Sequence, residues 1–149
     1  MNLSQHFTLA ELVASDIAVR HGIDNAPPPV VLEDMKRTAA LMEHVRTLLC
    51  VPIYITSGYR SSAVNKLAGS KAASKHVQGL ACDFKAPAYG DPLAVCKAIA
   101  ESEIVFDQLI LEFYNPTTGA GWTHVGLGKD NRRQVLTINN HGTFSGLQP

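Results

Sequence analysis

The feature that most restricts the fold of this chain is a histidine and an aspartate seven positions apart, His76 and Asp83. On one straight helix, seven residues rise roughly 10 Å, which is too far for two ligands of one metal ion. The chain must therefore turn between them if the two side chains are to meet, and Gly79 is the residue that permits such a turn. Residues 80–84 (LACDF) then have the pattern of a short buried strand that carries Asp83.

A neutral imidazole and one carboxylate are ligands that suit zinc. A catalytic zinc site adds a third protein ligand and leaves a fourth position for water. The third candidate is His124, in the stretch 121–126 (GWTHVG). Taken alone, the His76 and Asp83 pair also fits a surface histidine and a capping aspartate, so the metal-site hypothesis depends on the rest of the chain.

The order of predicted elements defines the fold class. Residues 7–13 have a helix-start pattern, with Thr8 as the cap and Glu11 three residues later. The longest predicted helix covers 30–49, where apolar residues recur at helical spacing. Shorter helices are predicted near 64–67 and at 93–100, and strands at 53–56, 80–84, 108–113, 122–127 and 134–138. Because helices come first and strands last, we expect one α+β domain over residues 1–149, with N-terminal helices packed on a mainly antiparallel sheet.

We place the core of this domain at about residues 7–138 and expect a loose C-terminal tail over the last ten residues.

The composition excludes several classes of protein. Lys and Arg number 13 and Asp and Glu also number 13, which argues against a nucleic-acid binder that uses a basic face. No apolar run approaches a membrane span, and the N-terminus lacks a secretory signal pattern. The cysteines Cys50, Cys82 and Cys96 are predicted to be reduced core residues, and we expect a monomer.

Four motifs occur in a fixed order along the chain. They are SGYRS (57–61) with Asn65, Ser74-x-His76 followed by Asp83, the run 106–112 (FDQLILE), and WTHV (122–125). Together they resemble the zinc peptidases of the D-alanyl-D-alanine carboxypeptidase family, M15, and most of all its small phage and prophage branch. The resemblance extends from about Phe7 to Ile138.

This resemblance implies a hedgehog-like α+β fold and hydrolysis of peptide bonds in the stem peptides of bacterial peptidoglycan. It implies one zinc ion held by His76, Asp83 and His124. Arg60 matches the arginine that contacts the substrate near the scissile carbonyl. Asn65 and Ser74 match polar positions on the substrate side.

The chain departs from the family pattern at one position. Many members carry an acidic general base three residues before the last zinc histidine, where this chain has Gly121. We expect Glu112 to take this role. If residues 108–113 and 121–127 pair as a hairpin, Glu112 lies opposite Trp122 and diagonal to His124, at roughly 7–8 Å between backbones. A slip of one residue would move Glu112 to the other face. Asp107 is on the opposite face in this register and is expected to be structural.

Several functional alternatives remain open from the sequence. The small size and the missing signal suit a phage lysis enzyme that is made in the host cytoplasm and reaches the wall after release, or a virion component. A second hypothesis is a zinc-bearing wall-binding or structural module without catalysis, and a third is a structural domain without metal. D-Ala-D-Ala, L-Ala-D-Glu and cross-bridge bonds are all possible targets, because pocket loops decide which bond is cut. Trp122 is expected to belong to the core.

Overall fold

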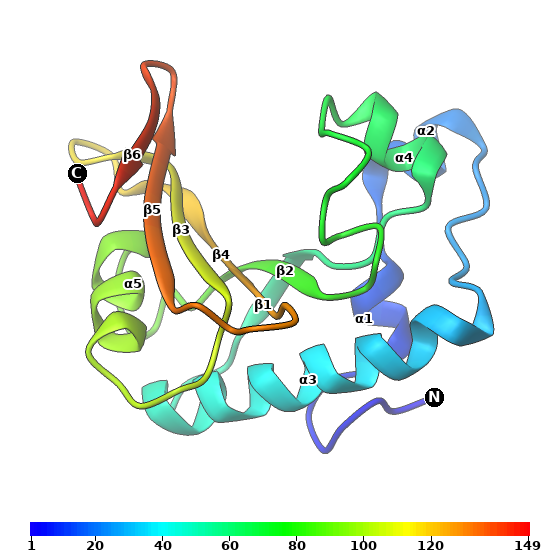
Figure 1. Ribbon diagram of the computed structural model, residues 1–149, viewed down its shortest axis with the longest axis horizontal. Helices are drawn as coiled ribbons and strands as arrows, with labels where there is room; N and C mark the ends of the chain where they lie inside the picture. Colours follow the sequence, from blue (N-terminus) through cyan, green and yellow to red (C-terminus); the bar gives the residue numbers. More distant parts are fainter.

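A computed structural model covers residues 1–149, and its centre is one six-stranded sheet in the order β1-β2-β4-β3-β5-β6 (Figure 1). All neighbouring strands are antiparallel except β3 and β5, which run parallel. The strands are β1 (Tyr54–Ser57), β2 (Ala81–Lys85), β3 (Gln108–Asn115), β4 (Ala120–Gly126), β5 (Gln134–Asn139) and β6 (Gly142–Ser145). The expected α+β class with a mainly antiparallel sheet is confirmed.

Five helices surround the sheet: α1 (Leu9–Val13), α2 (Asp16–His21), α3 (Pro29–Leu49), α4 (Ser62–Leu67) and α5 (Pro92–Ala100). The predicted capping box at the first helix is present, since the Thr8 side chain accepts a hydrogen bond from the Glu11 backbone and the Glu11 carboxylate accepts one from the Thr8 backbone. Pro29 occupies the first turn of α3, where its missing N–H costs no hydrogen bond. None of the helices is long and apolar enough to cross a membrane.

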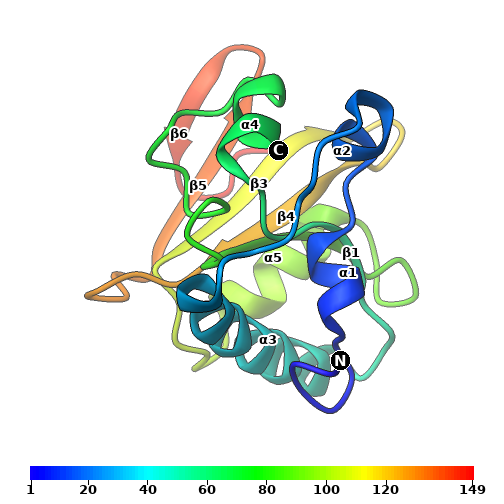
Figure 2. The same ribbon diagram turned by 90° about the vertical axis from the view of Figure 1, so that its right-hand side faces the viewer.

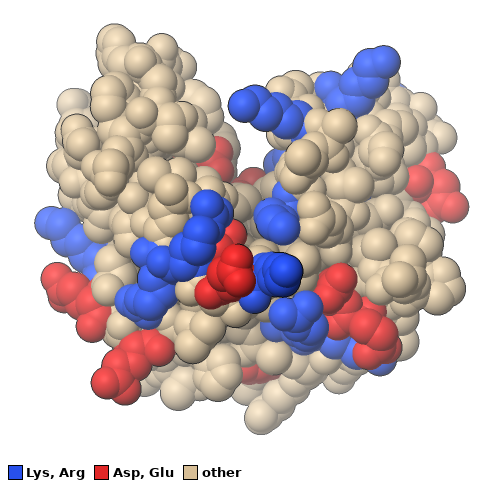
Figure 3. Space-filling view, in the orientation of Figure 1, with Lys and Arg blue, Asp and Glu red and all other residues tan.

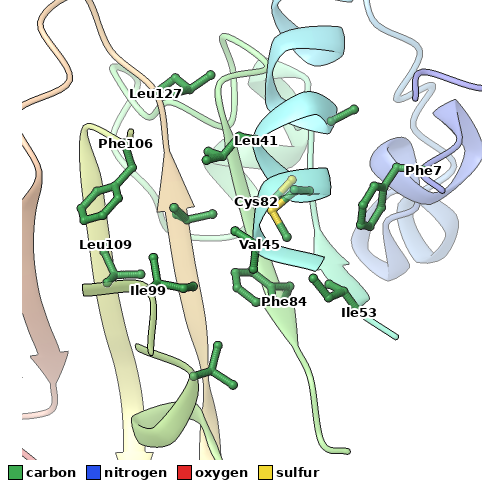
Figure 4. Packing of buried hydrophobic residues seen from close by; sticks show 14 of the residues in the cluster. Phe7, Leu41, Val45, Ile53, Cys82, Phe84, Ile99, Phe106, Leu109 and Leu127 are labelled. Carbon is green, nitrogen blue, oxygen red and sulfur yellow. The ribbon is translucent and has the colours of Figure 1, made fainter. Parts of the chain in front are cut away.

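The strict alternation of side chains along the central strands separates a core face from a second face of the sheet. Cys82 and Phe84 of β2, Leu109 of β3 and Val125 of β4 lie on the core face and have no exposed area. Helices α3 and α5 pack against this face and complete the hydrophobic core (Figure 4). The neighbouring residues in each strand therefore point to the opposite face, which is available for a site.

The second face opens into a hollow between two projecting parts of the molecule. One part is the β5–β6 hairpin, and the other is α4 with the loop 68–75 (Figure 1). The view in Figure 2 shows α3 and α4 on opposite sides of the sheet. The space-filling view shows the surface hollowed between the two projecting parts (Figure 3).

Three sequence-based expectations are corrected. The tail is not loose at 142–145, because these residues form β6 and pair with β5 after a turn in which Gly142 has φ +130°. Helix α2 has no counterpart in the prediction; Ser15 caps its start, and Gly22 ends it in the left-handed conformation. Cys50 is not a core residue but an exposed cap at the end of α3, with φ 57°. Cys82 and Cys96 are buried and free, as predicted.

Candidate metal centre

Asp83 and His124 are brought together by the register of the sheet. They are directly opposite each other in the β2–β4 pair, and Ile110 of β3 is opposite His124 on the other side. All three follow the alternation that sends their side chains to the face away from the core. Asp83 is 5% exposed and His124 is 8% exposed, so the two polar groups are almost completely removed from water.

His76 reaches the same point from a turn, as the sequence predicted. Gly79 has φ +72°, a conformation that glycine adopts without strain, and the Thr38 hydroxyl of α3 donates a hydrogen bond to its carbonyl at 2.7 Å. This turn sends the chain from His76 back into β2. The Nδ1 atom of His76 lies 2.7 Å from the Gly58 carbonyl oxygen, which holds the ring in place.

The three side chains form a tight and buried cluster. Nδ1 of His124 lies 2.8 Å from Oδ1 of Asp83, and Nε2 of His76 lies 3.3 Å from the same oxygen. One nitrogen or oxygen atom from each residue can be chosen so that all lie within 4.8 Å of one another. Two imidazoles and a carboxylate at these distances can hold a single metal ion.

The hydrogen bonding of His76 tests whether a cation fits between these groups. A carbonyl oxygen only accepts, so Nδ1 carries the hydrogen that is donated to Gly58, and Nε2 of the neutral ring presents a lone pair. This lone pair faces the Asp83 oxygen, which also only accepts when it is ionised. Two acceptors in this position repel each other unless a proton or a metal ion lies between them. The donor set therefore fits zinc, which takes imidazole nitrogen and carboxylate oxygen.

The environment keeps Asp83 ionised. Burial alone would raise the pKa of Asp83, but the neighbouring imidazoles of His124 and His76 outweigh it and hold the pKa well below its usual range. The ionised carboxylate is the form that binds a metal ion.

Glu112 lies beside this cluster on the same face. It is opposite Trp122 in the β3–β4 hairpin, which confirms the predicted register, and its Oε1 is 3.6 Å from Nδ1 of His124. Burial, followed by the negative charge of Asp83, raises the pKa of Glu112 to about 7. A bound cation acts in the opposite direction and favours the ionised carboxylate that a general base requires.

The backbone at Gly121 explains why no acidic side chain is found there. Gly121 has φ +110°, and a Cβ at this position would lie 2.7 Å from the backbone oxygen of Glu112. The close approach follows from an irregularity in the β3–β4 pairing between Glu112 and Asn115, where Phe113 has φ 51°. The bulge therefore leaves no room for a side chain at 121, while Glu112 lies just before it, in the regular pairing opposite Trp122.

We predict that Gly121→Ala lowers the free energy of unfolding by about 1–3 kcal/mol, the usual cost of a residue forced into an unfavourable backbone region. Gly142→Ala is the matched control, because Gly142 has φ +130° but nothing within 4 Å of an added Cβ. Urea denaturation of both variants separates the strain that they share from the steric clash that only Gly121→Ala has. Equal destabilisation by the two substitutions would show that the backbone oxygen of Glu112 does not clash with a Cβ at position 121.

Arg60 is fixed beside the cluster by three side chains. Its Nε donates to the Ser57 hydroxyl at 3.1 Å, Nη1 donates to the Ser70 hydroxyl at 3.0 Å, and Nη2 lies 3.4 Å from Oδ2 of Asp83. The side chain is only 15% exposed. A guanidinium has five N–H donors, so two remain for another ligand.

The other residues singled out by the sequence have different surroundings. The Ser74 hydroxyl accepts a hydrogen bond from the His76 backbone, at 3.3 Å. Asn65 is 2% exposed, and its amide group donates a hydrogen bond to the Lys71 carbonyl, which connects it to the loop 68–75.

Two further residues lie outside the metal cluster. Asp107 binds Arg132 through both carboxylate oxygens and is structural, as predicted. Trp122 is half-buried and lies outside the hydrophobic core, with its ring 5.5 Å from that of Phe113, so its assignment to the core was wrong.

Sequence reasoning missed three groups that hold the site. Ser57 and Gly58 lie inside the SGYRS motif, but their partners are seen only in the folded protein. The Ser57 hydroxyl binds Arg60, and the Gly58 carbonyl binds His76. Ser70 lies in a loop of small residues, and no pattern in the sequence connects it to an arginine ten positions earlier.

A buried cluster of two histidines and an aspartate, with a glutamate beside it on the same face of the sheet, is the arrangement of a metallopeptidase site. The family model described as Peptidase M15 matches residues 5–125, a range that includes every residue of this cluster and Glu112. The chain therefore belongs to the peptidase M15 family. No curated protein matches this chain.

Proposed function

We propose that this protein is a zinc peptidase that hydrolyses peptide bonds in the stem peptides of bacterial peptidoglycan, acting as an endolysin or as a DD-carboxypeptidase or endopeptidase. The single observation that carries the proposal is the position of Glu112. Its carboxylate lies 3.6 Å from Nδ1 of His124, on the same face as the three candidate metal ligands. Hydrolysis of a peptide bond requires activation of water and of the carbonyl, which a metal ion can supply. It also requires a group that transfers the proton, which an adjacent carboxylate can supply.

In this proposal His76, Asp83 and His124 hold one zinc ion. The bound metal would lower the pKa of a water molecule towards neutrality and polarise the scissile carbonyl. Glu112 would accept the proton of the attacking water and pass it to the leaving amine. Its position beside the proposed ligand His124 supports this role, because a general base must lie within reach of the water whose proton it accepts.

Arg60 has a separate role in this scheme. Its two unused N–H groups can bind a carboxylate of the substrate or stabilise the oxyanion that forms at the scissile carbonyl. The contacts with Ser57, Ser70 and Asp83 fix its orientation before the substrate binds. Ser74 and Asn65 support the same region, the first by holding the turn at His76 and the second by holding the loop that carries Ser70.

We predict that Arg60→Lys retains bound zinc and the fold but loses most of its catalytic activity. Lysine keeps the positive charge but lacks the planar fork, so it cannot bind Ser57, Ser70 and a substrate oxygen together. Arg20→Lys is the matched control, because Arg20 lies on α2 and its side chain donates a hydrogen bond to the Asp16 carbonyl of the same helix. If Arg60→Lys hydrolyses muropeptides as fast as the unchanged protein, Arg60 does not contact the reacting group.

The competing proposal is a zinc-bearing module that binds the wall or a phage structure without catalysis. Its support was the absence of an acidic residue at position 121, and the nearby Glu112 carboxylate weakens that support. Assignment to the small phage and prophage branch, and hence release to the wall during lysis or as part of a virion, rests on the motif resemblance alone.

The test of the proposed function is digestion of purified peptidoglycan followed by mass spectrometry of the fragments. We expect new fragments that differ by hydrolysis of one type of peptide bond, and we expect a metal chelator to prevent their formation. The mass of the fragments identifies the bond. Intact stem peptides after digestion with the zinc-loaded protein would instead favour the non-catalytic module.

A further inference from the structure

The two walls of the hollow differ in charge. The α4 wall, defined here as residues 60–75, contains Arg60, Lys66, Lys71 and Lys75 and no acidic residue. The hairpin wall, defined as residues 113–122 and 139–146, contains no Lys, Arg, Asp or Glu. Figure 3 shows Lys and Arg side chains on the rim of the hollow above α4, and none on the opposite rim. A ligand in the hollow therefore meets positive charge on one side only.

Two of these lysines are free to bind a ligand. Lys66, in the last turn of α4, and Lys71, in the loop 68–75, are both exposed. Only one lysine of the whole chain forms an ion pair, and it is Lys36 on α3. Lys75 differs from the other two, because its Nζ donates to the Gln78 side chain at 3.3 Å. Lys66 and Lys71 are thus the unneutralised charges of the α4 wall.

The loop that carries Lys71 is tied to the site. The Asn65 amide holds the Lys71 carbonyl at 2.9 Å, and the preceding residue, Ser70, accepts a hydrogen bond from Arg60. Arg60 in turn lies 3.4 Å from Asp83 of the metal cluster. The segment that carries Lys66 and Lys71 is therefore held beside Arg60, which contacts the metal cluster.

Charges of one sign along a cleft attract ligands of the opposite sign and increase their local concentration. A peptide that carries free carboxylates would place them against the α4 wall and its uncharged side chains against the hairpin wall. We propose that the α4 wall selects peptides with free carboxylates, through Lys66 and Lys71, an inference that rests on the proposed peptidase function. Peptides whose carboxylates are amidated are then the poorer substrates.

The experiment compares two forms of one stem peptide. In the first form the carboxylates are free, and in the second form they are amidated; the scissile peptide bond is the same in both. We expect kcat/KM to be about 3- to 10-fold higher for the free-carboxylate peptide, since exposed ion pairs contribute modestly. The combined variant Lys66→Ala with Lys71→Ala should lose this preference through KM. Lys85→Ala with Lys97→Ala, which removes the same charge at the end of β2 and on α5, should keep it. Raising the salt concentration to 0.5 M should reduce it.

Calorimetric binding of both peptides to the zinc-loaded Glu112→Gln variant gives a readout that does not depend on turnover. Equal affinity and equal kcat/KM for the two peptides would overturn the inference and leave the peptidase function intact. Cleavage of neither peptide, together with tighter, lysine-dependent binding of the free-carboxylate form, would overturn the peptidase function and leave only the preference in binding. If the two lysines affect only binding to walls that carry a phosphate polymer, and not binding to isolated peptides, the proposed substrate class is wrong.

Discussion

Replacing His124 by alanine is expected to remove most of the bound zinc and all measurable hydrolysis. The substitution deletes one of the three proposed protein ligands, and a site with only His76 and Asp83 lacks the ligand number of a catalytic zinc centre. The loss of zinc affinity should exceed the roughly 10- to 100-fold typical of removing an outer partner of a ligand. Elemental analysis after dialysis measures zinc occupancy, and the release of peptide fragments measures activity.

The control for this experiment is His21→Ala, which removes an exposed imidazole from the last turn of α2. It should retain zinc and activity. The His124 variant also leaves the buried Asp83 carboxylate with one histidine fewer, so a lower melting temperature is expected and circular dichroism must confirm that the protein is folded. Full zinc occupancy in folded His124→Ala would show that the metal ion lies elsewhere.

Glu112→Gln is expected to retain zinc and the fold and to lose activity by about 10²–10⁴-fold, the typical contribution of a general base. Glutamine keeps the size and shape of the side chain but has no basic carboxylate. The change also removes a partly buried group whose pKa is raised by burial, so no loss of stability is expected. Single-turnover rates on a defined muropeptide measure the effect on the chemical step.

Glu103→Gln provides the matched control, because Glu103 lies in the loop after α5 and not at the metal cluster. This variant should turn over at the normal rate. Near-normal turnover by Glu112→Gln would exclude Glu112 as the base and leave the chemistry to another acidic group. Loss of zinc from Glu112→Gln would show instead that Glu112 is itself a metal ligand.

The parts of the site that follow from local rules were predictable from the sequence. Alternation along β2, β3 and β4 identifies the face of Asp83, Glu112 and His124, because successive side chains in a strand point to opposite sides. The turn at Gly79 follows from the distance that His76 and Asp83 would otherwise have on a helix. The hairpin register follows from pairing the two strands around the turn at 115–119, and the structure has Glu112 opposite Trp122 as expected.

The parts that depend on contacts between distant segments were not predictable. Ser70 binds Arg60 only because the loop after α4 folds back over the site, and Asn65 is buried for the same reason. The strand β6 was missed because its four residues have little apolar character and gain their structure by pairing with β5. Trp122 was assigned to the core from its residue type, whereas its position in β4 places it on the side of His124.

In the proposed peptidase, His76, Asp83 and His124 hold a catalytic zinc ion beside Glu112. The most direct test is a crystal structure of the zinc-loaded protein with anomalous diffraction recorded at the zinc edge. We expect one anomalous peak about 2.0–2.2 Å from Nε2 of His76, Nδ1 of His124 and an oxygen of Asp83, with the Glu112 carboxylate facing the open position. A peak at another place, or a Glu112 side chain turned away from the metal ion, would contradict it.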